Sequence, residues 1–282
     1  MAKLTRNTHG KARVRVMRLH RDGGRHEVRE LTVEAMLTGD FGRSFTDADN
    51  STSVSTDTIR NVVNVVAREN LALDTEPFCA ALAERLLGLY GQVDSAAVTA
   101  HETKWTRMGV GGAPHPHAFV LDGNGKPFTE AVAVRGGRTA LRSGVSGFTF
   151  LKSTGSGWAD FAKDPYTTIP ETRDRVCATS MEAAWRWRSA PAGGHAAANA
   201  AILGAMLEVF AGTYSHSVQD SLYRMAAAAL EAVPEIEEVD LACPNKHYLL
   251  IDLSRFGLVN ENQVFLPTDE PHGQIECTVA RG

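Results

Sequence analysis

Four stretches of the sequence carry side chains that can exchange protons or hold a polar ligand. They are Gly10-Lys11, Ser55-Thr56-Asp57, the segment from Lys152 through Trp158 to Arg175, and Pro244-Asn245-Lys246-His247. Amine, hydroxyl and imidazole groups can pass protons, and a guanidinium presents a planar fork of donors. Taken singly, each stretch also has an ordinary role, as a solvated lysine, a helix cap, a core aromatic or a strand-end histidine.

Signatures of several other chemistries do not occur. The sequence has no phosphate-binding glycine loop of the GxGxxG or Walker type between a strand and a helix, and no GxSxG nucleophile elbow. His115-Pro116-His117 would place two imidazoles on one strand face, but no carboxylate or cysteine nearby completes a metal-ligand set. We therefore predict no metal site, and we expect buried, reduced thiols at the four widely spaced cysteines, Cys79, Cys177, Cys243 and Cys277.

Composition favours a protein that acts on a small molecule. The 282 residues are 43% hydrophobic and 22% charged, which is enough to build the core of one large or two medium domains. A formal net charge of -4 gives no basic surface for a nucleic acid. No stretch approaches the roughly 20 apolar residues of a membrane span, and the terminal Arg281-Gly282 is not a peroxisomal signal. We expect a cytoplasmic protein of bacterial type.

The elements that must position the four stretches follow from periodicity and turn residues. Residues 12–20 and 25–37 are β-rich and flank a Gly23-Gly24 turn, which predicts a hairpin. Apolar residues at helical spacing begin at Ile59, so Thr56 lies at the start of a helix that Ser55, Thr56 and Asp57 could cap. A second helix from about Glu76 and β segments over 93–108 and 117–134, the latter broken by Asp122-Gly123-Asn124-Gly125, complete the order ββααββ.

The same order repeats in the second half. We expect strands over 138–153 and 175–188, an alanine-rich helix over 195–212, a helix over 217–232, and strands over 236–253 and 263–280. The sequence thus predicts an α+β fold of two domains, 1–137 and 138–282, each with two helices on one face of an antiparallel sheet. Edge strands of such sheets favour side-by-side association into a closed ring.

Taken together and in order, the stretches resemble the urate oxidase (uricase) family. The matching segments are GKARVRV, DNSTSVSTDTIRN, LKSTGSGWADF, YTTIPETRDR, SVQ at 217–219 and CPNKHYLLIDLS. The resemblance implies the tunnelling fold, with tandem ββααββ domains, and assembly as a homotetramer. It also implies oxidation of urate by O2 and water to 5-hydroxyisourate and hydrogen peroxide, in purine breakdown and without metal or organic cofactor.

The family's substrate-binding residues map onto this chain position by position. Arg175 and Gln219 correspond to the pair that holds the purine edge, with backbone N–H donors expected at Val218 and Asp57. In the family the stacking phenylalanine follows a Ser-Gln or similar pair, whereas this chain reads Ser156-Gly157-Trp158, so Trp158 takes the place of the phenylalanine. The indole keeps a π-face and enlarges it, so stacking is expected to persist in a pocket of altered depth.

The resemblance assigns proton transfer to Lys11, Thr56 and His247. A lysine in water keeps its proton up to about pH 10.4, so a basic role needs burial or neighbouring charge. Thr56 also contacts substrate, and Asn245 is expected to hold O2 and then water above the purine plane. Lys11 and Thr56 come from one subunit and the remaining site residues from its neighbour, which places the site at an interface.

Two alternatives remain open from the sequence. A fold relative that acts on a pteridine or purine by hydrolysis or aldol chemistry would share the architecture, because fold alone does not fix function. Such a relative would be expected to carry an acidic purine-binding residue and often zinc ligands. A non-catalytic purine-binding paralogue would keep Trp158, Arg175 and Gln219 but lose Lys11, Thr56 or His247.

Overall fold

The computed structural model describes residues 2–282, and the chain divides into two compact units. The first unit extends to Gly144 and also includes Arg186–Ala197. The second unit comprises Val145–Trp185 and Ala198–Gly282. The division at residue 137 that the sequence suggests stays a prediction.

The first unit is built on an antiparallel sheet in the order β1-β2-β3-β6. β1 (His9–Asp22) and β2 (Arg25–Gly39) form the predicted hairpin around Gly23-Gly24. Their register shifts between Lys11 and Val14, and Arg13 has a φ of 58°, which marks a β-bulge. The bulge therefore lies directly beside Lys11.

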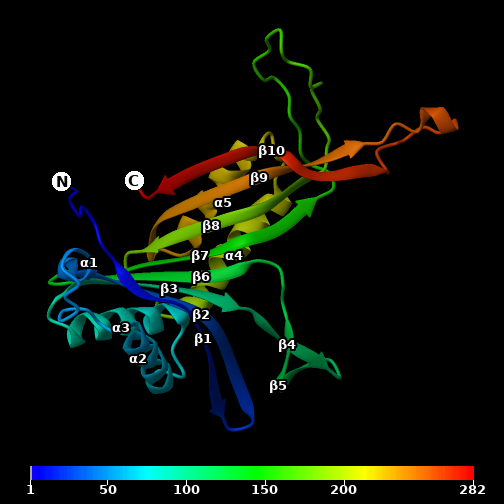
Figure 1. Cartoon of the computed structure of the whole chain (residues 1–282). Coiled ribbons are helices and arrows are strands. Elements are labelled where there is room, and N and C mark those ends of the chain that lie inside the picture. The colour runs from blue at the N-terminus through cyan, green and yellow to red at the C-terminus, as the bar shows by residue number, and fades with distance from the viewer. Residues whose placement is uncertain (1) are drawn as a thin grey trace. The chain divides into compact units, whose positions relative to one another are not determined.

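Two long helices cover one face of this sheet (Figure 1). α2 (Thr56–Glu69) and α3 (Thr75–Leu89) confirm the two helices predicted for the first repeat. Their buried residues, such as Val63 and Leu82, join alternate residues of the strands in one apolar core. A short helix, α1 (Gly42–Thr46), precedes α2.

The closing strands of the first unit differ from the prediction in one respect. β3 (Val93–Thr103) ends just before Lys104, and β4 (Trp105–Val110) pairs with β5 (Ala113–Leu121) as a separate two-stranded sheet before β6 (Lys126–Val134). The predicted strand over 93–108 is thus two strands, and the broken segment over 117–134 falls on β5 and β6. Arg107 holds this hairpin against β2, because it donates to the His26 carbonyl and pairs with Glu27 at 2.6 Å.

The second unit repeats the plan with the order β7-β8-β9-β10. Its strands confirm the four predicted segments, and a single 3-10 turn, η1 (Ser254–Phe256), follows β9. The strands are β7 (Ala140–Lys152), β8 (Cys177–Trp187), β9 (Ile236–Leu250) and β10 (Phe265–Ala280). α4 (His195–Gly212) and α5 (Val218–Ala232) match the two predicted helices. β9 and β10 pair antiparallel, with an irregularity between Thr268 and Gly273.

α4 corrects one expectation drawn from the sequence. It is long and apolar enough, by length and composition alone, to pass as a membrane span, although no stretch was expected to do so. Alanines supply much of its apolar character, and the residues at every fourth position form a stripe buried in the unit, namely Ala198, Ile202, Met206 and Phe210. The Phe210 ring packs edge-on against Phe150 of β7, with centroids 4.8 Å apart.

A chain of buried polar groups anchors the start of α4 in the first unit. The Trp187 indole donates to Ser143 at 2.8 Å, and the Ser143 hydroxyl donates to Glu76 at 2.7 Å. The His195 ring lies edge-on to Trp187, with centroids 4.8 Å apart. Asp74 accepts a hydrogen bond from the Ala196 N–H at 3.0 Å, which places a carboxylate at the N-terminus of α4.

The cysteines follow the prediction at three of four positions. Cys79, Cys177 and Cys243 are buried free thiols, whereas Cys277 on β10 is partly exposed. Burial raises the pKa of Cys243 to about 12, so this thiol stays protonated at neutral pH. Cys277 differs because it lies near the end of the outermost strand of its sheet, where less of the unit covers it.

Candidate active site

Lys11 lies at the start of β1, where the strand comes unusually close to β2. A Cβ at Gly10 would overlap the Ala35 carbonyl oxygen and lie 2.8 Å from the Met36 Cα, so only glycine fits there. Lys11 pairs with Ala35 immediately before the bulge and is partly buried. The glycine and the bulge together fix the direction in which the chain leaves Lys11.

His9 ties this strand to the segment that leads into α2. Its Nε2 lies 3.1 Å from the Val54 carbonyl oxygen, and its ring packs edge-on against Phe41, with centroids 4.3 Å apart. Val54 is two residues before Thr56. His9 therefore links the backbone around Lys11 to the backbone around Thr56, a role that local sequence patterns did not indicate.

Thr56 is the first residue of α2 and is exposed. The predicted side-chain cap does not form, because Ser55 makes no capping hydrogen bond, and the first intrahelical bond runs from Ile59 N–H to the Ser55 carbonyl. The Asp57 carboxylate pairs with Arg60 at 2.6 Å along the helix surface. Backbone donors in the first turn of α2, including the Asp57 N–H, precede that bond and can serve an external acceptor.

In the second unit, hydrogen bonds to the backbone hold the segment around Trp158. Trp158 donates its N–H to the Thr172 carbonyl at 2.7 Å and accepts from the Thr172 N–H at 2.9 Å. Gly157 donates to the Ser215 carbonyl at 2.9 Å. A Cβ at Gly157 would overlap the Tyr214 hydroxyl, which itself donates to the Arg173 carbonyl. The glycine at position 157 thus accommodates Tyr214.

Arg175 follows the same segment, and its Nε is buried without a hydrogen-bond partner. Its backbone N–H donates to the Ser156 carbonyl at 3.0 Å, which fixes its position relative to Trp158. Leaving a buried donor unsatisfied costs on the order of 1–3 kcal/mol, and more when the donor belongs to a charged group. The guanidinium therefore favours a ligand that supplies an acceptor.

Val218 and Gln219 occupy the first turn of α5. The Ser217 side chain caps the helix by accepting from the Asp220 N–H at 3.0 Å, which leaves the Val218 and Gln219 N–H groups ahead of the first intrahelical bond. Ser215, just upstream, pairs in parallel with Ser156. This pairing brings the start of α5 next to the segment that carries Trp158 and Arg175.

Asn245 and His247 lie on β9 two residues apart, so their side chains leave the same face of the strand. Cys243 shares this face and is buried next to Val218 of α5 in a small apolar cavity. Lys246 on the opposite face pairs with Asp269 at 3.0 Å. The strand therefore presents Asn245 and His247 on the side covered by the helices.

The sequence-predicted residues fall into two groups. Lys11, Thr56 and Asp57 belong to the first unit, and the other six belong to the second unit, namely Trp158, Arg175, Val218, Gln219, Asn245 and His247. Contacts through His9 bring the segments of Lys11 and Thr56 together in the first unit, and contacts through Ser156 and Tyr214 bring the segments of Trp158, Arg175 and Val218 together in the second.

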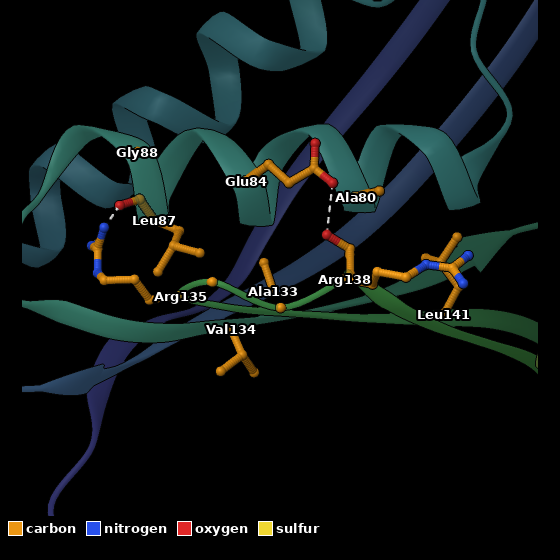
Figure 2. A pocket seen from close by; sticks show the side chains of 12 residues that line it. Ala80, Glu84, Leu87, Gly88, Ala133, Val134, Arg135, Arg138 and Leu141 are labelled. Carbon is orange, nitrogen blue, oxygen red and sulfur yellow. Dashed lines mark hydrogen bonds between the residues drawn. The ribbon is translucent and has the colours of Figure 1, made fainter.

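Two other features contain none of these residues. His115 and His117 pack edge-on with centroids 4.5 Å apart, and His26 lies against His117, yet residues 2–282 contain no group of three His, Cys, Asp or Glu suited to a metal ion. Figure 2 shows a groove of about 600 Å³ between α3 and the connection from β6 to β7. There Arg135 donates to the Leu87 carbonyl at the end of α3.

The fold and the placement of these residues define a class of protein. In each half of the chain, four strands of the main sheet and two long helices follow the order ββααββ, and the first half adds the short helix α1 and the β4–β5 hairpin. This is the α+β architecture of the tunnelling fold, here with polar residues gathered at helix N-termini and at strand ends.

Comparison with known proteins identifies the family. The chain matches the family model described as Uricase over residues 7–132 and 141–276. It is 37% identical to a uricase from Arthrobacter globiformis, over 99% of this chain and 90% of that protein, and 38% identical to one from Aspergillus flavus, over 97% and 95%. The crystal structure of the Arthrobacter globiformis uricase superposes with a TM-score of 0.92, covering 100% of this chain and 96% of that one. The chain belongs to the uricase family.

Proposed function

We propose that this protein is a urate oxidase that converts urate, O2 and water into 5-hydroxyisourate and hydrogen peroxide, as a step of purine catabolism. Family membership over nearly the whole chain supports the reaction. The structural observation that carries the proposal is the buried, unpartnered Nε of Arg175 beside Trp158 and the open first turn of α5. A planar polar anion can stack on Trp158, accept from the Arg175 Nε and accept from the free N–H groups of the first turn of α5.

Binding uses the groups of the second unit. The Trp158 indole stacks on the purine, and the Arg175 guanidinium donates to adjacent acceptors on its edge. The Gln219 carboxamide matches an edge that both donates and accepts, and the Val218 N–H adds a donor at a helix N-terminus that favours negative charge. The Asp57 N–H, at the start of α2, contributes in the same way.

Proton removal uses Lys11, Thr56 and His247. The Thr56 hydroxyl passes a proton between the substrate, or a bound water, and the Lys11 amine, and the His247 imidazole shares the proton load. Removal of a second proton from urate makes the purine electron-rich. The substrate can then supply electrons to O2 in single steps, and the protein contributes deprotonation, positioning and charge stabilisation.

Oxygen and then water are held by Asn245 above the purine plane, because its amide both donates and accepts. The electron balance closes without a further reductant. Urate loses two electrons and gains a hydroxyl group from water, and O2 takes up two electrons and two protons to leave as hydrogen peroxide. Neither a metal nor an organic cofactor takes part in this scheme.

The proposal includes assembly into a homotetramer with sites between subunits. The two repeats of the chain, 1–137 and 138–282, form the tunnelling-fold domains. One subunit contributes Lys11 and Thr56 to a site that its neighbour completes. Exposed apolar residues on the sheet face away from α2 and α3, such as Met17, Val132 and Val134, support burial of that face in an assembly. A cytoplasmic location stays a prediction.

The assay that tests the reaction uses protein dialysed against a chelator. Urate absorbance and dissolved O2 are followed together in air-saturated buffer, and we expect urate to disappear with matching O2 uptake. Binding of urate without its consumption would instead indicate a non-catalytic purine-binding protein. Activity that returned only after addition of a metal salt would contradict the cofactor-free reaction.

A further inference from the structure

We propose that Phe161 is a positioning residue that holds the Trp158 indole in the orientation needed to stack on substrate. This inference rests on the proposed function. The two rings are nearly parallel, with centroids 5.3 Å apart and an interplanar angle of 10°. Phe161 thus covers one face of the indole and leaves the opposite face for a planar ligand.

The local backbone produces this stack. Asp160 has a φ of 60°, a left-handed conformation that turns the chain back so that Phe161 lies over the residue three positions earlier. The two hydrogen bonds between Trp158 and Thr172 fix the backbone under the indole. The backbone of Trp158, which carries one ring of the stack, is therefore fixed in position.

Charged residues form ion pairs in the segment that carries Phe161. The Lys163 ammonium lies 5.8 Å from the centroid of the Phe161 ring and pairs with Glu171 at 2.5 Å. Arg173 lies 3.6 Å from the Asp160 carboxylate across the same connection. These contacts join the two arms of the β7–β8 connection, which projects as a long green loop in Figure 1.

A stack of this kind matters for binding because Trp158 is only partly buried. Without Phe161 the indole could turn about its side-chain bonds, and ordering it would oppose substrate binding. Stacking on the indole stabilises the bound substrate and the transition state to a similar extent. Loss of Phe161 is therefore expected to raise KM and to leave kcat nearly unchanged.

The first experiment compares Phe161→Leu, Phe161→Tyr and a surface control, Phe256→Leu, whose phenylalanine is 69% exposed. We expect Phe161→Leu to raise the KM for urate about 2- to 10-fold, with kcat within about 2-fold. Phe161→Tyr keeps a ring and should retain the wild-type KM, as should Phe256→Leu. A wild-type KM for Phe161→Leu would overturn the proposal.

A double-mutant cycle shows whether Phe161 acts through Trp158. In a Trp158→Leu background, Phe161→Leu should cause no further rise in KM, because no indole remains to be positioned. Equal rises in both backgrounds would mean a general structural role and would reject the inference. Near-UV circular dichroism and thermal unfolding of each variant identify any loss of folding, and Phe161→Met then replaces Phe161→Leu as the ring-free variant.

The outcome for the wild-type protein separates this inference from the proposed function. Turnover of urate by the wild type, with no effect of Phe161 substitutions, rejects only the positioning role. Absence of urate binding and turnover in the wild type rejects the proposed function, and the positioning role falls with it.

Discussion

Arg175, Lys11 and Thr56 show how little a residue type alone says about its role. Each has a common structural alternative, and position decides between them. Arg175 has a buried Nε with no acceptor. Lys11 lies between a β-bulge and Gly10, a position where a Cβ would overlap the backbone of β2. Thr56 opens a helix whose preceding serine does not cap it. Departures of this kind from ordinary local structure lower stability, and they concentrate at functional sites.

Lys11→Met is the most informative single substitution in the proton-handling group. The methionine keeps the length of the side chain but cannot exchange a proton. We expect kcat for urate to fall by at least about 100-fold, while the dissociation constant of a non-oxidisable xanthine analogue changes little, because Arg175 and Trp158 are intact. Steady-state kinetics and calorimetric titration measure the two quantities.

Lys3→Met is the matched control, since Lys3 is an exposed lysine near the same end of the chain. It should leave both quantities unchanged. If Lys11→Met turns over urate at the wild-type rate, Lys11 has no basic role.

At the scale of elements, most of the fold could be predicted from the sequence. Hairpin turn glycines, helical periodicity from Ile59 and Glu76, and the alanine-rich segment at 195–212 are local signals, and the structure has the elements there. The break at Lys104 and the missing cap at Ser55 were not predicted, because they depend on tertiary contacts. The roles of His9, Ser156 and Phe161 were not predicted for the same reason. These residues lie in or near the segments that resemble the uricase family, but the segments alone do not show their contacts.

His195, at the start of α4, makes stability depend on pH. Desolvation by burial lowers its pKa below the ordinary value, against an opposite effect of the Glu76 and Asp74 carboxylates. As pH falls below about 6.5, the unfolded chain binds a proton that the folded protein does not yet bind. The free energy of unfolding should therefore decrease as the pH falls through this window.

His195→Phe removes this contribution and keeps an aromatic ring against Trp187. We expect the decline in the free energy of unfolding between pH 7.5 and 5.5 to be smaller than in the wild type, as measured by urea denaturation at each pH. His101→Phe, at an exposed position on β3, controls for the change of residue type. An equal or steeper decline in His195→Phe would show that this histidine does not cause the acid sensitivity.

For the whole molecule, the central structural question is whether one chain can complete a site. In the proposed homotetramer, Lys11 and Thr56 come from one subunit and Arg175, Gln219, Asn245 and His247 come from another. Short sequence motifs alone cannot show whether a site forms within one subunit or between two, because the same residues are needed in both arrangements.

Mixing two inactive variants tests this division of labour. Lys11→Met and Arg175→Met each lack one half of the site, but a mixed pair of subunits has one site with both halves intact. Random mixing by joint refolding should restore about a quarter of the wild-type activity. Sites built within one subunit would give no restoration, because every chain carries a defect. Each variant refolded alone is the matched control.

The reaction itself is tested most directly by separating binding from oxidation. Chelator-treated protein is mixed with urate under nitrogen, and air is then admitted while urate, O2 and hydrogen peroxide are followed. We predict that urate binds and stays intact under nitrogen, and that air starts its loss with equal amounts of O2 consumed and peroxide released. Loss of urate under nitrogen, or no loss in air, would contradict it.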